Sequence, residues 1–230
     1  ANASTILVSG DFAPSTLTPH TGTVNLNGAG SQQINGAYTF NNLTLSGGGT
    51  KILTAGTNIS GILTLTSGVL RLGNFDLIFT GTTGTIAIAG TPGAGAMIET
   101  NGTGVLRFTN AGIANTALNG TYPVGYNGTY NPVVVSGLAG GPANRTFNIR
   151  VVSGQLMSTG INRYWEIGQT NVTGTATLSF AYNAGEATGD RAKFQPYTNY
   201  SGSWDLAPSP SAQGVNPVIS TIPAALPATS

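Results

Sequence analysis

Few residues of this chain could carry acid–base chemistry. It has seven carboxylates and one histidine, His20, which lies between Pro19 and Thr21 in an expected loop. No G-x-S-x-G element accompanies this histidine, so an ordinary loop residue is favoured over a member of a Ser-His-Asp triad. A lyase or hydrolase built on stacked strands needs two or three carboxylates on one face of the fold. In the region of repeats only Asp76 and Glu99 qualify.

We expect Asp76 and Glu99 to form surface ion pairs rather than a catalytic pair. They are about one repeat apart, and Arg71 and Arg107 are the neighbours available to them. No other acidic cluster occurs in the repeats. We therefore predict that the protein is not an enzyme and has no catalytic residue.

Two further motifs only partly match known binding sites. Glu186 and Asp190 in AGEATGD lack the D-x-[DN]-x-[DN]-G spacing of a calcium loop. The three glycines before Thr50 and Lys51 lack the G-x-x-x-x-G-K-[ST] order of a phosphate-binding loop, and a β-turn is expected there. The chain has no cysteine, which excludes thiolate metal sites and disulfides. We predict no metal and no cofactor.

Aromatic residues in expected loops are the candidates for surface contact with a ligand. Exposed Tyr and Trp rings stack on sugars and also favour protein contacts, although some of these rings must cover the core. The candidates form two groups, which are Tyr122, Tyr126 and Tyr130, and Tyr197, Tyr200 and Trp204.

The composition favours an exported protein. Only 7% of the residues are charged and the formal net charge is +1, whereas about 25% is usual for the charged fraction. Because no Lys or Arg cluster is present, nucleic acid is not an expected partner. No run of about 18 apolar residues is present, so no membrane span is expected. Low charge with abundant Thr and Asn indicates a secreted protein, extracellular or on the cell surface.

Short alternating runs at regular spacing predict stacked β-strands. In residues 41–74, leucine and isoleucine alternate with polar residues between Gly, Ser, Thr and Asn turns. Matching runs follow one another after 18, 18, 16 and 20 residues, at Ile34, Ile52, Leu70, Ile86 and Leu106. This period is typical of a parallel β-helix, a solenoid in which each coil pairs with the coils above and below. An antiparallel meander is the alternative, but it explains the alternation and not the spacing.

The second half of the chain has longer runs and no repeat. Strands at this spacing, with Gly and Pro turns, predict an antiparallel immunoglobulin-like β-sandwich of about seven strands. Trp165 is the candidate for a buried aromatic residue in its core. We therefore predict an all-β protein in two parts. Residues 1–115 form a β-helix-like repeat region with an N-terminal strand, and residues 116–230 form a β-sandwich with a Pro-rich C-terminal tail.

The order of these motifs resembles a known family. GTVNLNGAGSQQING, FNNLTLSGGGTKILT and NISGILTLTSGVLRLGN are followed by TYPVGYNGTYNPVVV and NRYWEI. Together they are similar to the repetitive secreted surface proteins of Bacteroidetes-type bacteria. The resemblance covers about residues 21–181. It implies a bacterial adhesin-like protein in which β-helical repeats lead into an immunoglobulin-like sandwich, and it carries over no catalytic residue.

The apolar segment Thr5, Ile6, Leu7 and Val8 is the candidate self-assembly strand. Open strand edges at the end of a stack invite pairing with another copy, although this segment could also cap its own stack. We predict an extracellular structural protein that assembles into a homopolymeric filament or surface layer, with copies of itself as partners. The alternative is a monomeric adhesin segment that binds a glycan or a protein on a host or cell surface.

Overall fold

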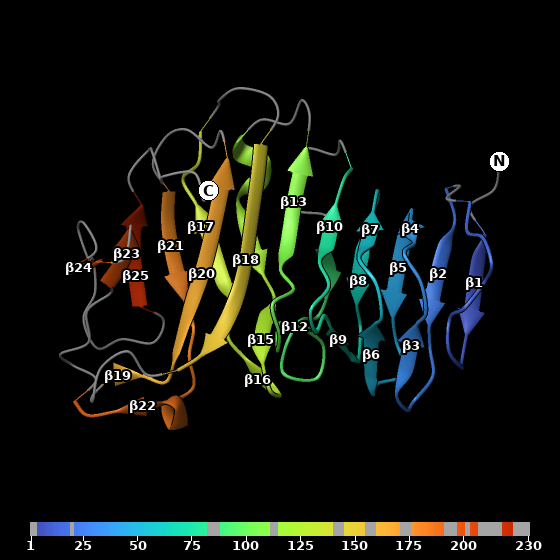
Figure 1. Ribbon diagram of the computed structural model, residues 1–230, viewed down its shortest axis with the longest axis horizontal. Helices are drawn as coiled ribbons and strands as arrows, with labels where there is room; N and C mark the ends of the chain where they lie inside the picture. Colours follow the sequence, from blue (N-terminus) through green and yellow to red (C-terminus); the bar gives the residue numbers. More distant parts are fainter. Residues whose placement is uncertain are drawn as a thin grey trace.

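Short strands make up nearly all of the regular structure (Figure 1). The computed structural model describes residues 4–18, 21–81, 88–110, 115–139, 145–154, 160–170, 176–190, 197–200, 203–206 and 218–222. Within these ranges the only helices are two short 3-10 turns, η1 (Asn115–Leu118) and η2 (Ala184–Glu186). No helix in the described ranges has the length and apolar character needed to cross a membrane. The predicted all-β class is confirmed.

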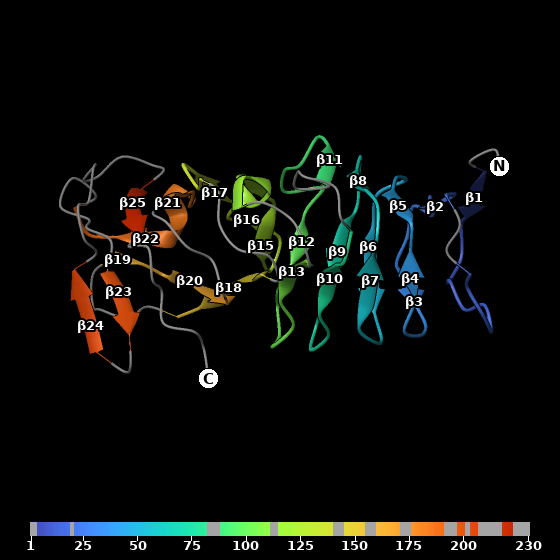
Figure 2. The ribbon, with the colours of Figure 1, turned by 90° about the horizontal axis from the view of Figure 1, so that it is seen from above.

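Three sheets extend along the long axis of the molecule (Figures 1 and 2). Sheet A contains β1 (Thr5–Val8), β2 (Thr23–Leu26), β5 (Asn42–Leu45), β8 (Leu63–Leu65) and β11 (Ile88–Gly90). Sheet B contains β3 (Gln32–Ile34), β6 (Thr50–Leu53), β9 (Val69–Arg71), β12 (Ile98–Glu99), β15 (Val124–Tyr126) and β16 (Thr129–Tyr130). Sheet C contains β4 (Thr39–Phe40), β7 (Thr57–Ile59), β10 (Leu77–Phe79), β13 (Leu106–Asn110), β18 (Arg145–Ser153) and β20 (Arg163–Thr170).

Each pass of the chain through the three sheets forms one coil, and successive coils pair strand for strand. In sheet A, Val24 lies opposite Leu43, and Leu43 lies opposite Leu63, all in parallel strands. The same parallel pairing joins β3 to β6 and β4 to β7. The backbone donors and acceptors of an inner strand are therefore satisfied by the coils on either side of it.

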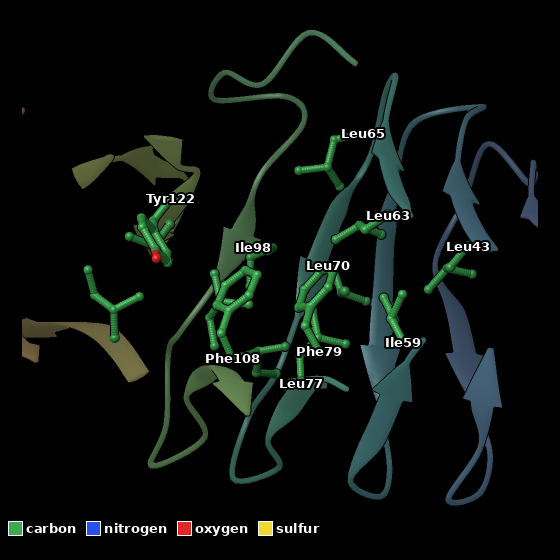
Figure 3. Close-up of a cluster of buried hydrophobic side chains, with 14 of the residues drawn as sticks. Leu43, Ile59, Leu63, Leu65, Leu70, Leu77, Phe79, Ile98, Phe108 and Tyr122 are labelled. Carbon is green, nitrogen blue, oxygen red and sulfur yellow. The ribbon is translucent and has the colours of Figure 1, made fainter. Parts of the chain in front are cut away.

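Alternation in the sequence buries one side of each of these strands. The inward residues of β5 and β8, which are Leu43, Leu45, Leu63 and Leu65, are completely buried. Farther along the stack the rings of Phe79 and Phe108 lie parallel, with their centroids 4.6 Å apart. Figure 3 shows Leu43, Leu63, Leu65, Phe79 and Phe108 among the side chains that fill the interior of the coils. Because each buried leucine contributes about 1.5–3 kcal/mol, this interior dominates the stability of the first half.

Sheet B departs from the hydrophobic pattern at β6. Lys51 is buried in this strand, whereas its neighbour Ile52 is partly exposed. The register places Leu70 opposite Lys51 and not opposite Ile52. At β6, hydrophobicity alone therefore selects the wrong residue for the core.

The predicted steps of 18 residues are one residue short of the register of the first coils, in which Ile34 pairs with Leu53 and Lys51 with Leu70. The later part of the predicted series is wrong, because Leu70 pairs with Ile98 and Leu106 belongs to sheet C, opposite Leu77. Ile86 lies outside the described residues.

Strands of the second half continue two of the three sheets. β15 pairs with β12 in parallel, and β18 pairs with β13 in the antiparallel direction. Sheets B and C therefore continue past residue 115, where the sequence predicts a division between two parts of the chain. That division stays a prediction. A fourth sheet, sheet D, is antiparallel and contains β14 (Gly120–Tyr122), β17 (Val133–Ser136), β21 (Ala176–Phe180) and β25 (Val218–Ile222). Two small pairs complete the described strands, which are β19 (Gly160–Ile161) with β22 (Ala187–Thr188), and β23 (Tyr197–Tyr200) with β24 (Ser203–Leu206).

One hydrophobic cluster extends from the coils into the second half. It contains residues of sheet D, such as Val133 and Leu178, as well as residues of β18. Trp165 of β20 is partly buried against this cluster, and its ring centroid lies 4.9 Å from that of Phe180. Its indole N–H donates to the carbonyl oxygen of Asn131 at 3.1 Å. Trp165 therefore packs against the core, as predicted, but its ring is partly rather than fully buried.

Candidate functional site

β1 is the outermost strand of sheet A, and one of its edges has no partner among the described residues. On the other edge, the carbonyl oxygens of Ser4 and Val8 accept backbone hydrogen bonds from the β2 segment at 2.8 and 2.9 Å. Residues in a parallel strand direct their backbone groups alternately to one side and the other. The N–H and C=O groups of Thr5 and Leu7 therefore face the free edge.

Two aliphatic side chains of β1 are exposed. Ile6 is 53% exposed and Leu7 is 65% exposed. Ile6 lies in register with Val24, whose side chain is buried, so Ile6 occupies a core-facing position with no described coil on its outer side. The predicted self-assembly segment thus combines an open backbone edge with uncovered apolar surface, which are the two features that strand addition requires.

Side-chain hydrogen bonds fix β1 and the loop after it to the next coil. Gln32 is buried, and its Nε2 donates to the carbonyl oxygen of Val8 at 2.9 Å and to that of Gly10. The Oδ1 atom of Asp11 accepts the backbone N–H of Gln33 at 2.7 Å. The edge is therefore already ordered before a partner arrives, which reduces the entropic cost of pairing.

An aromatic cluster fixes the chain between β1 and β2. Phe12 is buried and forms a parallel bridge with Ile34. The ring centroids of Tyr38 and Phe40 lie 5.0 and 5.3 Å from that of Phe12. The Tyr38 hydroxyl donates to the carbonyl oxygen of Pro14 at 2.8 Å. These contacts make the first coil part of the packed body rather than a loose arm.

Sequence reasoning did not identify Gln32 or Phe12 as supports of this edge. A signal for Gln32 was present, because it lies two residues before Ile34 and must share its inward side in a strand. A polar residue in such a position needs buried hydrogen-bond partners. Phe12 offered no periodic signal, since it lies in a loop with Pro14.

Tyr122 does not belong to a contact surface. It is completely buried, its hydroxyl donates to the carbonyl oxygen of Leu118 at 2.8 Å, and burial raises its pKa well above the ordinary value. Its ring lies between those of Phe108 and Phe147, with centroids 5.3 and 5.1 Å away. The prediction of surface contact is wrong for this residue, because its ring joins the core of the coils to that of the second half.

The other tyrosine candidates lie in two hairpins. Tyr126 and Tyr130 belong to β15 and β16, and both are partly buried. The guanidinium carbon of Arg163 lies 5.0 Å from the Tyr126 ring centroid, and burial raises the pKa of Tyr130. Tyr197 and Tyr200 belong to β23 and Trp204 to β24, and their side chains lie outside what the structure describes.

Asp76 and Glu99 each pair with a different arginine. Arg71 Nε donates to Glu99 Oε2 at 2.5 Å, and Arg107 Nη2 lies 2.9 Å from Asp76 Oδ2. Glu99 lies in sheet B, whereas Asp76 directly precedes β10 of sheet C. The predicted ion pairs are confirmed. The Glu99 pair is not a surface pair, however, because this carboxylate is buried and also accepts the backbone N–H of Gly128 at 2.8 Å.

The two ion pairs predict unequal effects of neutral substitutions. We expect Glu99→Gln to lower the free energy of unfolding by about 1–3 kcal/mol, because the amide cannot accept from both Arg71 and Gly128. Asp76→Asn should cost less than about 1 kcal/mol, because the amide oxygen can still accept the backbone N–H of Val105 and the lost ion pair with Arg107 is partly exposed to water. Urea unfolding of both variants measures this difference, and equal losses would contradict it.

The remaining candidate motifs have structural roles or lie outside the described residues. Arg163 Nε lies 3.0 Å from Glu186 Oε1, and Asn131 Nδ2 donates to Glu186 Oε2 at 2.7 Å. Asp190 is exposed, and within the described ranges no three His, Asp or Glu side chains gather as metal ligands would. The three glycines before Thr50 form a turn with positive φ. His20 lies outside the described residues.

Comparison of the chain with protein-family models, with curated proteins and with solved structures finds no match.

Proposed function

We propose that this is an extracellular structural protein that assembles with copies of itself by strand addition at β1. The unpaired edge of this strand, presented by Thr5 and Leu7, is the observation that carries the proposal. A strand edge of this kind is a template for pairing with another chain. Ile6 and Leu7 add apolar contact area that water covers in the isolated chain.

We also propose that the coils form a parallel β-helix and that the second half is an immunoglobulin-like sandwich. Parallel pairing of successive coils in three sheets supports the β-helix. The shared hydrophobic cluster of sheet D and β18 supports two packed sheets. A rod of this kind suits a filament or surface layer, and the resemblance to bacterial surface proteins supports a location outside the cell.

The substitution Leu7→Pro tests the role of the edge. Proline at this position removes an N–H that faces the free edge. No hydrogen bond between β1 and β2 is lost, and an edge strand tolerates proline where its N–H faces solvent. We expect the variant to remain monomeric in light scattering and to form no polymers in negative-stain microscopy, under conditions in which the unaltered protein assembles. Its melting temperature should change by less than about 4 °C, equivalent to about 1 kcal/mol.

Leu7→Thr is the matched control. Threonine keeps the N–H and the preference for a strand, but it removes most of the exposed apolar side chain. Assembly by this variant, together with its loss in Leu7→Pro, would assign the effect to backbone pairing. Assembly of Leu7→Pro at the level of the unaltered protein would overturn the proposal.

The alternative is a monomeric adhesin segment that binds a glycan. The partly exposed rings of Tyr126 and Tyr130 in the β15–β16 hairpin are the described residues that such a surface would use. A glycan array separates the two functions. Specific glycan binding by a protein that stays monomeric would replace the structural function.

A further inference from the structure

We propose that the partner of β1 is β1 of a second copy, paired in the antiparallel direction about a two-fold axis that passes beside Ile6. This inference rests on the proposed function, in which the free edge recruits another copy. It adds the orientation, the register and the symmetry of the contact. It also implies that this contact by itself forms a closed pair of molecules, so that a filament or layer of the proposed kind is built from such pairs through a second contact.

The two ends of the coil stack are different, which disfavours head-to-tail pairing. At the far end, sheet B finishes with the antiparallel strand β16, and sheet C continues into the antiparallel strands β18 and β20. Figure 2 shows the second half of the chain extending along the long axis beyond β11, the last strand of sheet A. A copy that approached β11 with its own β1 would meet these strands, whereas nothing among the described residues lies beyond the free edge of β1.

The backbone of β1 is self-complementary. The groups on the free edge belong to Thr5 and Leu7, with Ile6 between them directed toward β2. An antiparallel copy can therefore place Thr5 opposite Leu7 of the partner and Leu7 opposite Thr5, with both hydrogen bonds of each pair formed. This register places Ile6 opposite its own counterpart at a position without cross-strand hydrogen bonds, where side chains approach most closely.

The side chains at this axis suit a contact between identical surfaces. β1 contains no charged residue, so the two-fold axis brings no like charges together. Ile6 is 53% exposed in one chain, and the partner's Ile6 would cover it on the core-facing side of sheet A. Asp11, the only charged residue in positions 4–18, has its Oδ1 atom occupied by the N–H of Gln33. The pairing thus continues the core from one molecule to the next.

Single cysteines test the register directly, because the chain has none of its own. In the proposed pairing the Cα atoms of the two Ile6 residues lie about 4.5 Å apart, within the range that a disulfide accepts. Ile6→Cys should therefore form a covalent dimer under mild oxidation, at least about tenfold more than Leu7→Cys does. Leu7 is the more exposed position, so random collision would favour the opposite order. A mixture of Thr5→Cys and Leu7→Cys proteins should cross-link to each other more than either does alone.

The outcomes separate this inference from the proposed function. If the unaltered protein assembles and Leu7→Pro does not, but Ile6→Cys gives no more dimer than Leu7→Cys, then strand addition stands and the two-fold register is wrong. If the unaltered protein is monomeric at all concentrations and no cysteine variant cross-links, both fail. Preferential dimers of Ile6→Cys, read by non-reducing electrophoresis of the full chain, support both.

Discussion

Replacement of Gly47 with alanine is expected to destabilise the protein by about 3 kcal/mol or more, whereas the same change at Gly48 costs about 1–2 kcal/mol. Both glycines have positive φ values, 91° and 82°, so both alanines are strained in a similar way. Only at Gly47 would the new Cβ meet the neighbouring coil, where it would lie 2.6 Å from the Asn27 carbonyl carbon and still closer to the carbonyl oxygen. No heavy atom lies within 4 Å of the corresponding position at Gly48.

The difference in the free energy of unfolding between these two variants measures the contact between coils, because backbone strain is similar in both. Urea unfolding of both proteins gives the two free energies on one scale. Equal losses would mean that the turns of successive coils are not stacked as described. A larger loss in Gly47→Ala would show that close backbone approach at the corner of the coil contributes to the register.

Replacement of Lys51 with methionine is expected to lower the free energy of unfolding by about 1–3 kcal/mol at neutral pH. Its Nζ donates to the carbonyl oxygens of Gly28 at 2.6 Å and of Gly48 at 2.8 Å. Methionine leaves these buried acceptors without this donor, at a cost of about 1–3 kcal/mol each. Removal of the cost of burying an ammonium group offsets part of this loss. Lys51→Gln keeps a donor without the charge and should recover part of the stability.

The effect of Lys51→Met should grow with pH. Burial lowers the pKa of Lys51 from its ordinary value of 10.5, so the unfolded chain binds this proton more tightly than the folded chain. The stability contributed by Lys51 therefore rises as the pH increases from the folded-state pKa to 10.5. Tyr122 and Tyr130 are present both in the unaltered protein and in Lys51→Met, so their effects on the pH dependence of stability cancel when the two proteins are compared. Urea unfolding near pH 7 and near pH 10 measures the trend, and a difference that shrinks with pH would contradict it.

Much of the first half could be predicted from the sequence, because its core residues alternate with polar ones. In the alternating runs of residues 41–74, for example, Leu43, Leu45, Leu63 and Leu65 are all buried. The pattern failed where a polar side chain is buried for a specific hydrogen bond. Lys51 occupies the inward position of β6 because the carbonyl groups of the neighbouring turns surround its Nζ, and hydrophobicity carries no information about that arrangement.

The second half could be predicted less well, because strand pairing there depends on contacts that are distant in sequence. Tyr122 is flanked by turn residues and looked exposed, yet the change from parallel to antiparallel pairing between β13 and β18 encloses its ring. At the candidate site, the apolar character of Ile6 and Leu7 was evident from sequence. The direction of their backbone groups was not, because it follows from the register of β1 against β2.

The strand-for-strand register of the coils makes the length of the molecule adjustable in whole steps. Residues 42–61 contain one complete coil, formed by β5, β6 and β7. Without them, Val24 would meet Leu63 in place of Leu43, which is a pairing of the same kind. Each coil accounts for about 4.7–4.9 Å, the spacing of neighbouring strands. The number of coils therefore sets the distance between the free edge of β1 and the antiparallel strands of the second half, and this distance can change without any change in the residues at either end.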